Sequence, residues 1–150
     1  MYPDNRAFKQ WEYRGTVCYL VLTSMGHACG YARFPSKPVK EDGYYGILTY
    51  VPVHGGITYA EKDDAGMVYG FDCAHSGDDC DPRTWDTEWL KGQCQVMVDA
   101  IIAAATVEDE YLATEDSGER GKLLDRYLEP FGGPNMGNFG MLLNLMAGQL

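Results

Sequence analysis

The first third of the chain alternates short apolar runs with turn residues. The run YRGTVCYLVLTS (13–24) and the run HACGYARF (27–34) are rich in β-branched and aromatic residues and lie on either side of a short turn. Runs of this composition, bounded by glycine and polar residues, are typical of strands. We therefore predict two adjacent strands here. A polar lead precedes them, and the charged, proline-containing segment 35–43 is expected to be a loop.

Two further β-rich regions follow that loop. YYGILTYVPV (44–53) is strand-like but contains Pro52, which cannot donate to a ladder and so indicates an edge or a strand end. HGGITYAEK (54–62) and MVYGFD (67–72) are joined by a short Asp/Gly segment, an arrangement typical of a hairpin. Together the runs predict a small, mainly antiparallel β-sheet over about residues 13–72.

From Asp81 onward the apolar period changes to three or four residues, which is the period of a helix. Asp81 or Thr84 can cap its start, and Pro82 suits a first turn. The pattern predicts a long helix over about residues 84–105. Its recurring positions are Trp85, Trp89, Gln93, Val96, Met97, Ala100, Ile101 and Ala104.

Shorter helices are predicted beyond the long one. One begins after Thr106, and another extends from Ser117 to a stop at Pro130. We therefore expect a single α+β domain over residues 1–130, in which the sheet packs against the long helix. Residues 131–150 form a glycine-rich connector and an apolar C-terminal segment. That segment is expected to dock on its own domain or to support a homo-oligomer.

Composition narrows the classes of function. The 150 residues carry a formal net charge of -10, which disfavours general attraction to nucleic acid or to an anionic membrane surface. Five cysteines without a CxxC pair, and no signal peptide, predict reduced thiols in a cytoplasmic protein. No apolar run approaches the roughly 20 residues that a membrane span needs. A small anion can still bind at a local cluster of donors.

The three histidines stand at the predicted junctions between strands and turns. His27 lies in MGHACGY, His54 in VHGGITY and His75 in FDCAH. Because the ends of neighbouring strands can meet at one edge of a sheet, these imidazoles can line a single pocket and supply an acid and a base. Asp72, three residues before His75, can orient an imidazole, and the paired Gly55 and Gly56 offer backbone N–H groups to an anion.

Other interpretations of the same residues stay open. Each histidine alone also fits an ordinary hydrogen-bonded surface position, and nearby donors such as Cys29, Cys73 and Asp72 would suit a transition metal. The spacing does not match a closed zinc site, so no metal and no cofactor is assigned. Cys73 is a candidate nucleophile or simply a buried thiol. Tyr31 and Tyr59 can stack a base or pack on the sheet.

The blocks MGHACGY (25–31), VHGGITY (53–59) and YGFDCAHSGD (69–78) together resemble a family of small, largely uncharacterised proteins of bacteriophages and prophages. The resemblance covers about residues 11–105. It implies a phage accessory protein located in the host cytoplasm. It also draws attention to the motif residues His27, Cys29, Gly30, His54, Gly55, Gly56, Asp72, Cys73, His75, Gly77 and Asp78. Asp78 otherwise fits the acidic start of a helix.

The leading functional hypothesis is a counter-defence enzyme. His27, His54 and His75, oriented by Asp72, would hydrolyse a small phosphorylated ligand, possibly a nucleotide immune signal, as a phosphodiesterase does. Ligand contacts are expected from Gly55, Gly56, Tyr31, Tyr59, Cys29, Cys73 and Asp78. Two alternatives are a binding protein that sequesters such a nucleotide without changing it, and an acidic inhibitor of a host defence complex.

Overall fold

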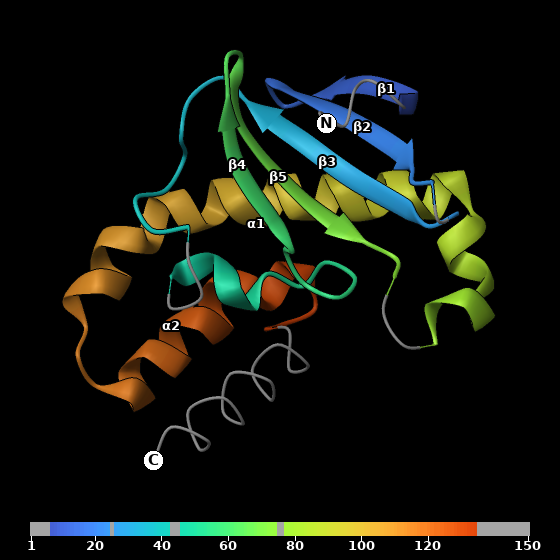
Figure 1. Ribbon diagram of the computed structural model, residues 1–150. Helices are drawn as coiled ribbons and strands as arrows, with labels where there is room; N and C mark the ends of the chain where they lie inside the picture. The colour runs from blue at the N-terminus through green and yellow to red at the C-terminus, as the bar shows by residue number, and fades with distance from the viewer. Residues whose placement is uncertain (1–6, 25, 43–45, 75–76, 135–150) are drawn as a thin grey trace.

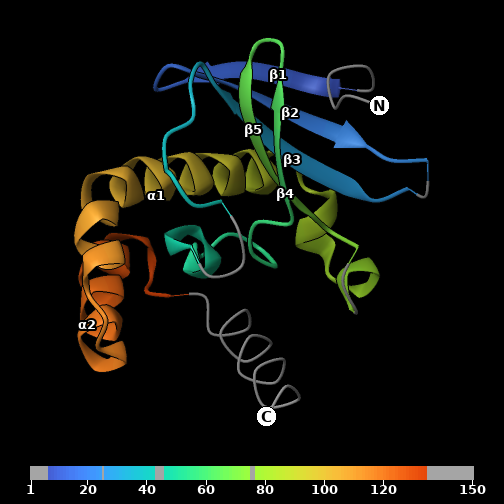
Figure 2. The same cartoon turned by 60° about the vertical axis from the view of Figure 1, so that its left-hand side comes forward.

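The computed structural model describes residues 7–24, 26–42, 46–74 and 77–134 of the chain. An antiparallel sheet is covered on one face by the long helix α1, and the shorter helix α2 lies beside the second half of α1 (Figures 1 and 2). The fold is therefore α+β, as predicted. The five strands are β1 (Ala7–Tyr13), β2 (Thr16–Leu22), β3 (Ala28–Phe34), β4 (Tyr59–Asp63) and β5 (Gly66–Asp72).

The strand order in the sheet is β1-β2-β3-β5-β4, and every neighbouring pair is antiparallel. The predicted hairpin before residue 72 is confirmed as β4 and β5, which are joined at Asp64 and Ala65. The central strand β3 pairs with β2 on one side and β5 on the other, so segments about 40 residues apart in sequence meet at the middle of the sheet.

The face of the sheet toward α1 forms the core. Leu20, Ala32 and Phe71 on this face are almost fully buried together with Met97 and Ile101 of the helix. Gly30 of β3 fits only because it lacks a side chain, since an added Cβ would lie 2.3 Å from Phe71 and 2.7 Å from the Cys94 sulfur. This close approach fixes the sheet against α1.

The opposite face of the sheet is closed by its own aromatic and charged side chains. Arg33 forms an ion pair with Asp63 at 2.7 Å, and its guanidinium also contacts the Tyr19 ring at 5.1 Å. Tyr31 and Tyr59 pack edge to face, with ring centroids 5.4 Å apart. Because side chains alternate along a strand, these residues point away from α1.

Helix α1 spans Thr87–Ala113, so the predicted start near residue 84 and end near residue 105 are both too early. Two short turns, η3 (Asp78–Cys80) and η4 (Pro82–Trp85), precede it, and the side chain of Asp86 caps it. The separate helix predicted after Thr106 is wrong. The buried stripe of α1 continues through that position because Glu108 and Tyr111 are both buried.

Helix α2 (Ser117–Leu128) confirms the predicted C-terminal helix, and a short turn, η5 (Glu129–Phe131), follows it. Buried residues from Cys18 to Leu128 join one core cluster. Beyond Pro134 the chain lies outside the described residues, as does the apolar segment predicted to dock. None of the helices that the structure describes combines the length and apolar composition that crossing a bilayer requires.

Two predictions in the sheet region are wrong. Residues 7–13, interpreted as a polar lead, form the edge strand β1, in which Trp11 and Tyr13 alternate with polar residues. Within 44–53 the described residues contain no strand. They form the 3-10 turn η2 (Ile47–Tyr50), whose Ile47 and Leu48 are buried in the core. This run packs against α1 and α2, and an apolar run buried against helices has the same composition as a strand within a sheet.

Candidate functional site

The start of β3 and the end of β5 lie side by side at one end of these two interior strands. Cys29 pairs with Asp72 across the two strands, and the Cys73 N–H donates to the Ala28 carbonyl at 2.9 Å. Antiparallel pairing therefore brings the backbone of the MGHACGY block next to that of the GFDCAH block. Sequence analysis expected the motifs to meet at the ends of neighbouring strands, and the backbone of two of them does so.

His54 reaches this region from the loop after η2. A turn closed by a hydrogen bond from the Gly56 N–H to the Val53 carbonyl, 2.8 Å long, surrounds it. Gly55 and Gly56 both have positive φ, 71° and 79°, which only glycine adopts without strain. The Gly56 N–H is thus already used within the turn, so of the two glycine amides expected to bind an anion, the Gly55 amide is the better candidate.

Helix α1 fixes the orientation of the His54 loop. The His54 backbone N–H donates to Gln93 Oε1 at 2.8 Å, and the imidazole packs edge to face on the Trp89 indole, with ring centroids 5.3 Å apart. Both partners project from the first half of α1, one helical turn apart. The imidazole is consequently held against a rigid helix, and 18% of its side chain is exposed.

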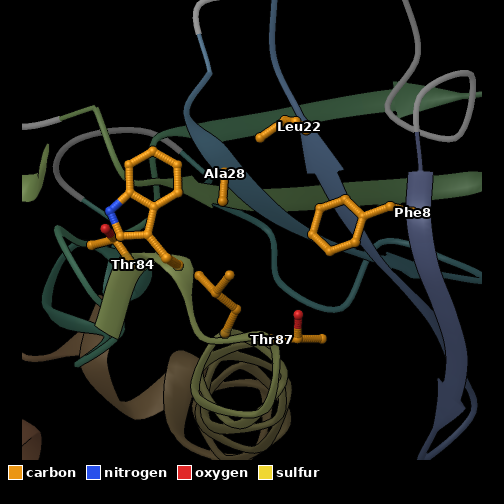
Figure 3. A pocket seen from close by; sticks show the side chains of 7 residues that line it. Phe8, Leu22, Ala28, Thr84 and Thr87 are labelled. Atoms are coloured by element: carbon orange, nitrogen blue, oxygen red, sulfur yellow. The ribbon is translucent and has the colours of Figure 1, made fainter. Parts of the chain in front are cut away.

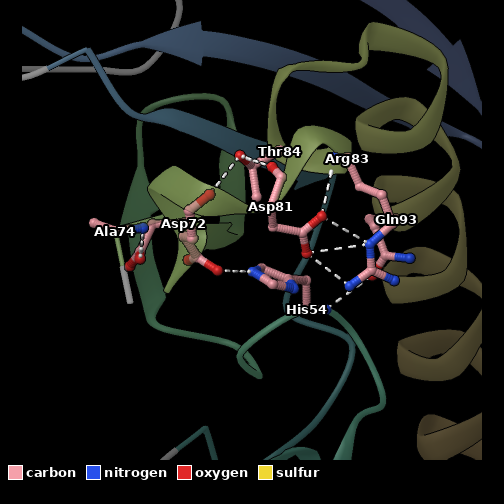
Figure 4. Close-up of polar contacts among 8 residues, drawn as sticks. His54, Asp72, Ala74, Asp81, Arg83, Thr84 and Gln93 are labelled. Atoms are coloured by element: carbon pink, nitrogen blue, oxygen red, sulfur yellow. Dashed lines mark hydrogen bonds and ion pairs between the residues drawn. The ribbon is translucent and has the colours of Figure 1, made fainter. Parts of the chain in front are cut away.

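The His54 imidazole is hydrogen-bonded to a buried carboxylate. His54 Nε2 lies 2.7 Å from Asp78 Oδ1, and Asp78 is only 5% exposed (Figure 4). The Thr84 hydroxyl donates to the Asp78 main-chain oxygen at 2.9 Å, which ties η3 to η4. A carboxylate beside Nε2 favours the tautomer with its proton on Nε2, so Nδ1 carries the lone pair. We call these two residues the His54–Asp78 pair.

Arg83 and Asp81 lie beside that pair (Figure 4). The Arg83 guanidinium binds the Asp81 carboxylate through Nε and Nη2 and covers the Trp89 ring at 5.0 Å. Hydrogen bonds from the side chain and the backbone of Arg83 hold the pKa of the Asp81 carboxyl below its usual range. The indole of Trp89 is thus contacted both by an imidazole and by a guanidinium.

The orienting role that sequence analysis gave to Asp72 is held, for His54, by Asp78. Asp72 Oδ1 accepts a hydrogen bond from the Ala74 N–H at 3.0 Å, which shapes the backbone after β5 (Figure 4). His75, the histidine that Asp72 was expected to orient, lies outside the described residues. Asp72 also points to the face of the sheet opposite α1, because it pairs with Cys29 on the outward side.

Cys29, Tyr31 and Tyr59 share that outward face, so the expected ligand contacts divide between two sides of the sheet. Tyr31 lies opposite Gly70, which in turn pairs with Tyr59. Burial, together with the neighbouring Cys29, raises the pKa of the Tyr31 hydroxyl. These side chains lie on the outer face of the sheet, whereas Trp89 and Gln93, which contact His54, belong to α1 on the other face.

Cys73 lies on the α1 side, and its chemistry does not suit a nucleophile. Burial raises the pKa of this thiol to about 12, and the Asp78 carboxylate adds to the rise. A thiol acts as a nucleophile only as the thiolate, which is scarce at neutral pH when the pKa is this high. The described geometry therefore favours the alternative in which Cys73 is a buried thiol.

His27 is fixed by its backbone. Its N–H donates to the Thr23 hydroxyl at 3.1 Å, and its carbonyl accepts from the Thr23 N–H at 2.8 Å, which closes the turn between β2 and β3. The structure describes no hydrogen bond or ring contact between the side chains of His27 and His54. Of the three histidines expected in one pocket, His54 is the one whose ring has a described carboxylate partner.

A separate hollow lies on the other side of Thr84. Its volume is about 180 Å³, and Figure 3 shows Phe8 and Thr84 on opposite sides of it, with Leu22 and Ala28 from the strands and Thr87 from the start of α1. Trp85 and Leu90 complete the lining. The sequence analysis predicted none of these residues to belong to a functional site. The lining is mostly apolar and has no charged group, so it does not suit acid–base chemistry.

Arg83, Trp89 and Gln93 are the site residues that sequence analysis missed. Trp89 and Gln93 were assigned to the buried stripe of the helix, and Arg83 was not singled out. Their four-residue spacing beyond Trp85 was visible, but nothing in the sequence showed that one side of this stripe would meet the loop of His54. That contact depends on the long-range placement of residues 46–58.

Among the described residues, no group of three or more histidine, cysteine, aspartate or glutamate side chains is arranged to hold a metal ion. Comparisons of the chain with protein-family models, with curated proteins and with solved structures gave no match. The resemblance to small phage proteins therefore stays a prediction, and the function has to be argued from the chemistry of the His54–Asp78 pair.

Proposed function

We propose that the protein is a hydrolase that cleaves a small phosphorylated ligand, with nucleotides as the favoured class, at the His54–Asp78 pair. The observation that carries this proposal is the 2.7 Å contact between the His54 ring and a carboxylate that is almost fully buried. An imidazole oriented by a buried carboxylate is a recurring general base in hydrolytic enzymes. A surface histidine with a solvated partner would not support the same proposal.

The chemistry proposed for the pair is direct attack by water. Nδ1 of His54 takes a proton from water as the water oxygen bonds to phosphorus, and the bond from phosphorus to the leaving oxygen breaks. The proton then passes from the imidazolium to that leaving oxygen, so the protein returns to its starting state. Asp78 stabilises the imidazolium between the two transfers and keeps the ring in one tautomer.

The biological role we propose is counter-defence in an infected cell, with a nucleotide immune signal as substrate. This part of the proposal rests on the resemblance of the three motif blocks to phage proteins. The small size of the chain and its acidic surface agree with a diffusible cytoplasmic protein that does not bind nucleic acid. Sequestration of the same ligand without cleavage is the competing outcome of the experiment below.

The proposal is tested by incubating the protein with a panel of cyclic and linear nucleotides and following both substrate and product by chromatography. We expect at least one nucleotide to be consumed with formation of a stoichiometric product. His54→Gln should abolish turnover, because glutamine can still bond to Asp78 but cannot accept a proton. Glu119→Gln, an exposed change on α2, is the matched control and should keep the wild-type rate.

Two results would count against hydrolysis. A nucleotide that disappears from solution but is fully recovered after heat denaturation of the protein would indicate sequestration. A folded His54→Gln variant with unchanged turnover would show that the active residues lie elsewhere. The fold of each variant is checked by circular dichroism before its rate is interpreted.

A further inference from the structure

We infer that Arg83 is the phosphate-binding residue of this site and that it recognises phosphate through one edge of its guanidinium while the other edge is held by Asp81. The inference deepens the proposed function, since it names the residue that selects an anionic ligand there. Neither the motif blocks nor the expected ligand contacts include Arg83. Three features of Arg83 support this role: the geometry of its donors, the contact of its guanidinium with the Trp89 ring and its exposure to solvent.

The guanidinium has two edges that can each bind a pair of oxygens. Nε and Nη2 form the edge that faces Asp81, with contacts of 3.1 Å from Nε to Oδ1 and 2.8 Å from Nη2 to Oδ2. The remaining edge consists of Nη1 and the second proton of Nη2. It has no acceptor among the residues that the structure describes. A planar edge of this kind matches two oxygens of a phosphate.

The position of that edge is fixed before any ligand arrives. Asp81 accepts a hydrogen bond from the Arg83 backbone N–H at 3.0 Å as well as from its side chain, so both ends of the residue are tied to the same carboxylate. The guanidinium lies over the Trp89 ring at 5.0 Å. A side chain held at three points loses little conformational entropy when it binds an anion.

The Arg83 side chain is held in one position and is also accessible to solvent. Its side chain is 61% exposed, whereas the comparably paired Arg33 on the outer face of the sheet is only 12% exposed. Arg33 is enclosed by Asp63 and Tyr19 and has a structural role. Arg83 and His54 both contact the Trp89 ring, so the same indole supports the guanidinium that would bind the anion and the proposed general base.

The carboxylates nearby set the charge that this site offers. Asp81 is neutralised by Arg83, and Asp78 is hydrogen-bonded to His54. Because the charges of Arg83 and Asp81 compensate each other and Asp78 adds a further carboxylate, the site has no surplus of positive charge. It offers an anion directed hydrogen bonds from one guanidinium edge, which suits a single phosphate group, and no positive field that would hold a polyanion such as a nucleic acid. We therefore assign as ligand a small molecule with one accessible phosphate.

The inference is tested by measuring the affinity for inorganic phosphate, by phosphorus NMR titration, for the wild type, Arg83→Gln, Arg83→Lys and Arg126→Gln. Arg126 is the matched control, an exposed arginine of α2 with an acidic partner, Glu110. We expect Arg83→Gln to weaken phosphate binding by about 10-fold or more, the usual range for a lost charged hydrogen-bond pair. Lysine should not restore it, because an ammonium lacks the second edge.

Each outcome of this experiment is decisive. Phosphate affinity that is unchanged in Arg83→Gln, absent in the wild type, or equally reduced in Arg126→Gln overturns the inference, and full rescue by lysine overturns the two-edge geometry. If the wild type hydrolyses a nucleotide, Arg83→Gln should raise KM more than it lowers kcat. If the wild type hydrolyses nothing while phosphate binding still requires Arg83, the proposed hydrolysis fails and the phosphate site stands.

Discussion

Two carboxylates of this protein are buried to nearly the same degree but have different partners. Asp78 is 5% exposed and bonds to the imidazole of His54, whereas Glu108 is 4% exposed and accepts backbone N–H groups from Lys40 and Glu41 at 2.7 to 3.1 Å. The Glu108 partners do not titrate, and they fix the loop before η2 onto α1. The partner of Asp78 can gain and lose a proton.

The comparison shows that burial of an acid does not by itself mark a functional site. A buried carboxylate must be compensated by hydrogen bonds wherever it lies, and backbone amides do so as well as a histidine does. What distinguishes Asp78 is that its compensating group can do chemistry and lies next to an exposed guanidinium. Glu108 should therefore control stability, and Asp78 should control activity.

The largest effect is expected from Asp78→Asn. The asparagine keeps the shape but presents an amide to Nε2, so the imidazole loses its preferred tautomer and the stabilisation of its protonated form. We expect kcat to fall by about 10³-fold, within the range for general base catalysis. Steady-state kinetics with a nucleotide that the panel experiment shows to be cleaved measure this fall. Glu108→Gln, which keeps an accepting oxygen, is the control and should leave kcat within about twofold.

The second largest effect is expected on stability, from the loss of the Glu108 carboxylate. Glu108→Ala leaves the Lys40 and Glu41 amides without their acceptor and releases the loop from α1. We expect the free energy of unfolding to fall by about 2–3 kcal/mol, with Glu108→Gln losing roughly half of that. Urea unfolding followed by tryptophan fluorescence measures both. A loss in Asp78→Asn as large as in Glu108→Ala would remove the distinction between the two acids.

The elements of the fold differ in how far the sequence could predict them. The hairpin of β4 and β5, the strands β2 and β3, and both helices follow from local composition and period. Edge strand β1 was missed because one of its faces is solvated, which makes half of its residues polar. Residues 47–53 were misassigned because burial against α1 and α2 selects the same apolar residues as a strand does.

For the site, the sequence pointed to the loop of His54 but did not predict its partner. His54 was chosen because it stands beside two glycines, and those glycines do adopt positive φ. Asp72 was expected to orient a histidine because it is close in sequence to His75, yet the described partner of His54 is Asp78, 24 residues away. Contacts of that length depend on how η3 and the η2 loop pack, which no local pattern encodes.

A third acid, the half-buried Asp63, extends the comparison to the effect of pH on stability. Its ion pair with Arg33 holds the pKa of the Asp63 carboxyl below its usual range. A carboxyl with a depressed folded-state pKa contributes stability above its unfolded pKa and loses it as pH falls through the folded-state value. We expect the wild type to lose stability below about pH 4, and Asp63→Asn to lose less over that interval. Urea midpoints from pH 6 to pH 3 test this, and parallel curves would contradict it.

The smallest effect expected is on the thiol of Cys73. Burial is the main reason that its pKa is raised to about 12, and the negative charge of Asp78 is the next. Asp78→Asn should therefore lower this pKa modestly and speed alkylation of Cys73 by iodoacetamide, by less than about tenfold. Glu108→Gln should leave the rate unchanged. Alkylation is read by mass spectrometry in a Cys80→Ser background, because Cys80 is exposed and would react first. If Asp78→Asn and Glu108→Gln sped the alkylation equally, general loosening of the fold would explain the change. The charge of Asp78 would then not distinguish this carboxylate from that of Glu108.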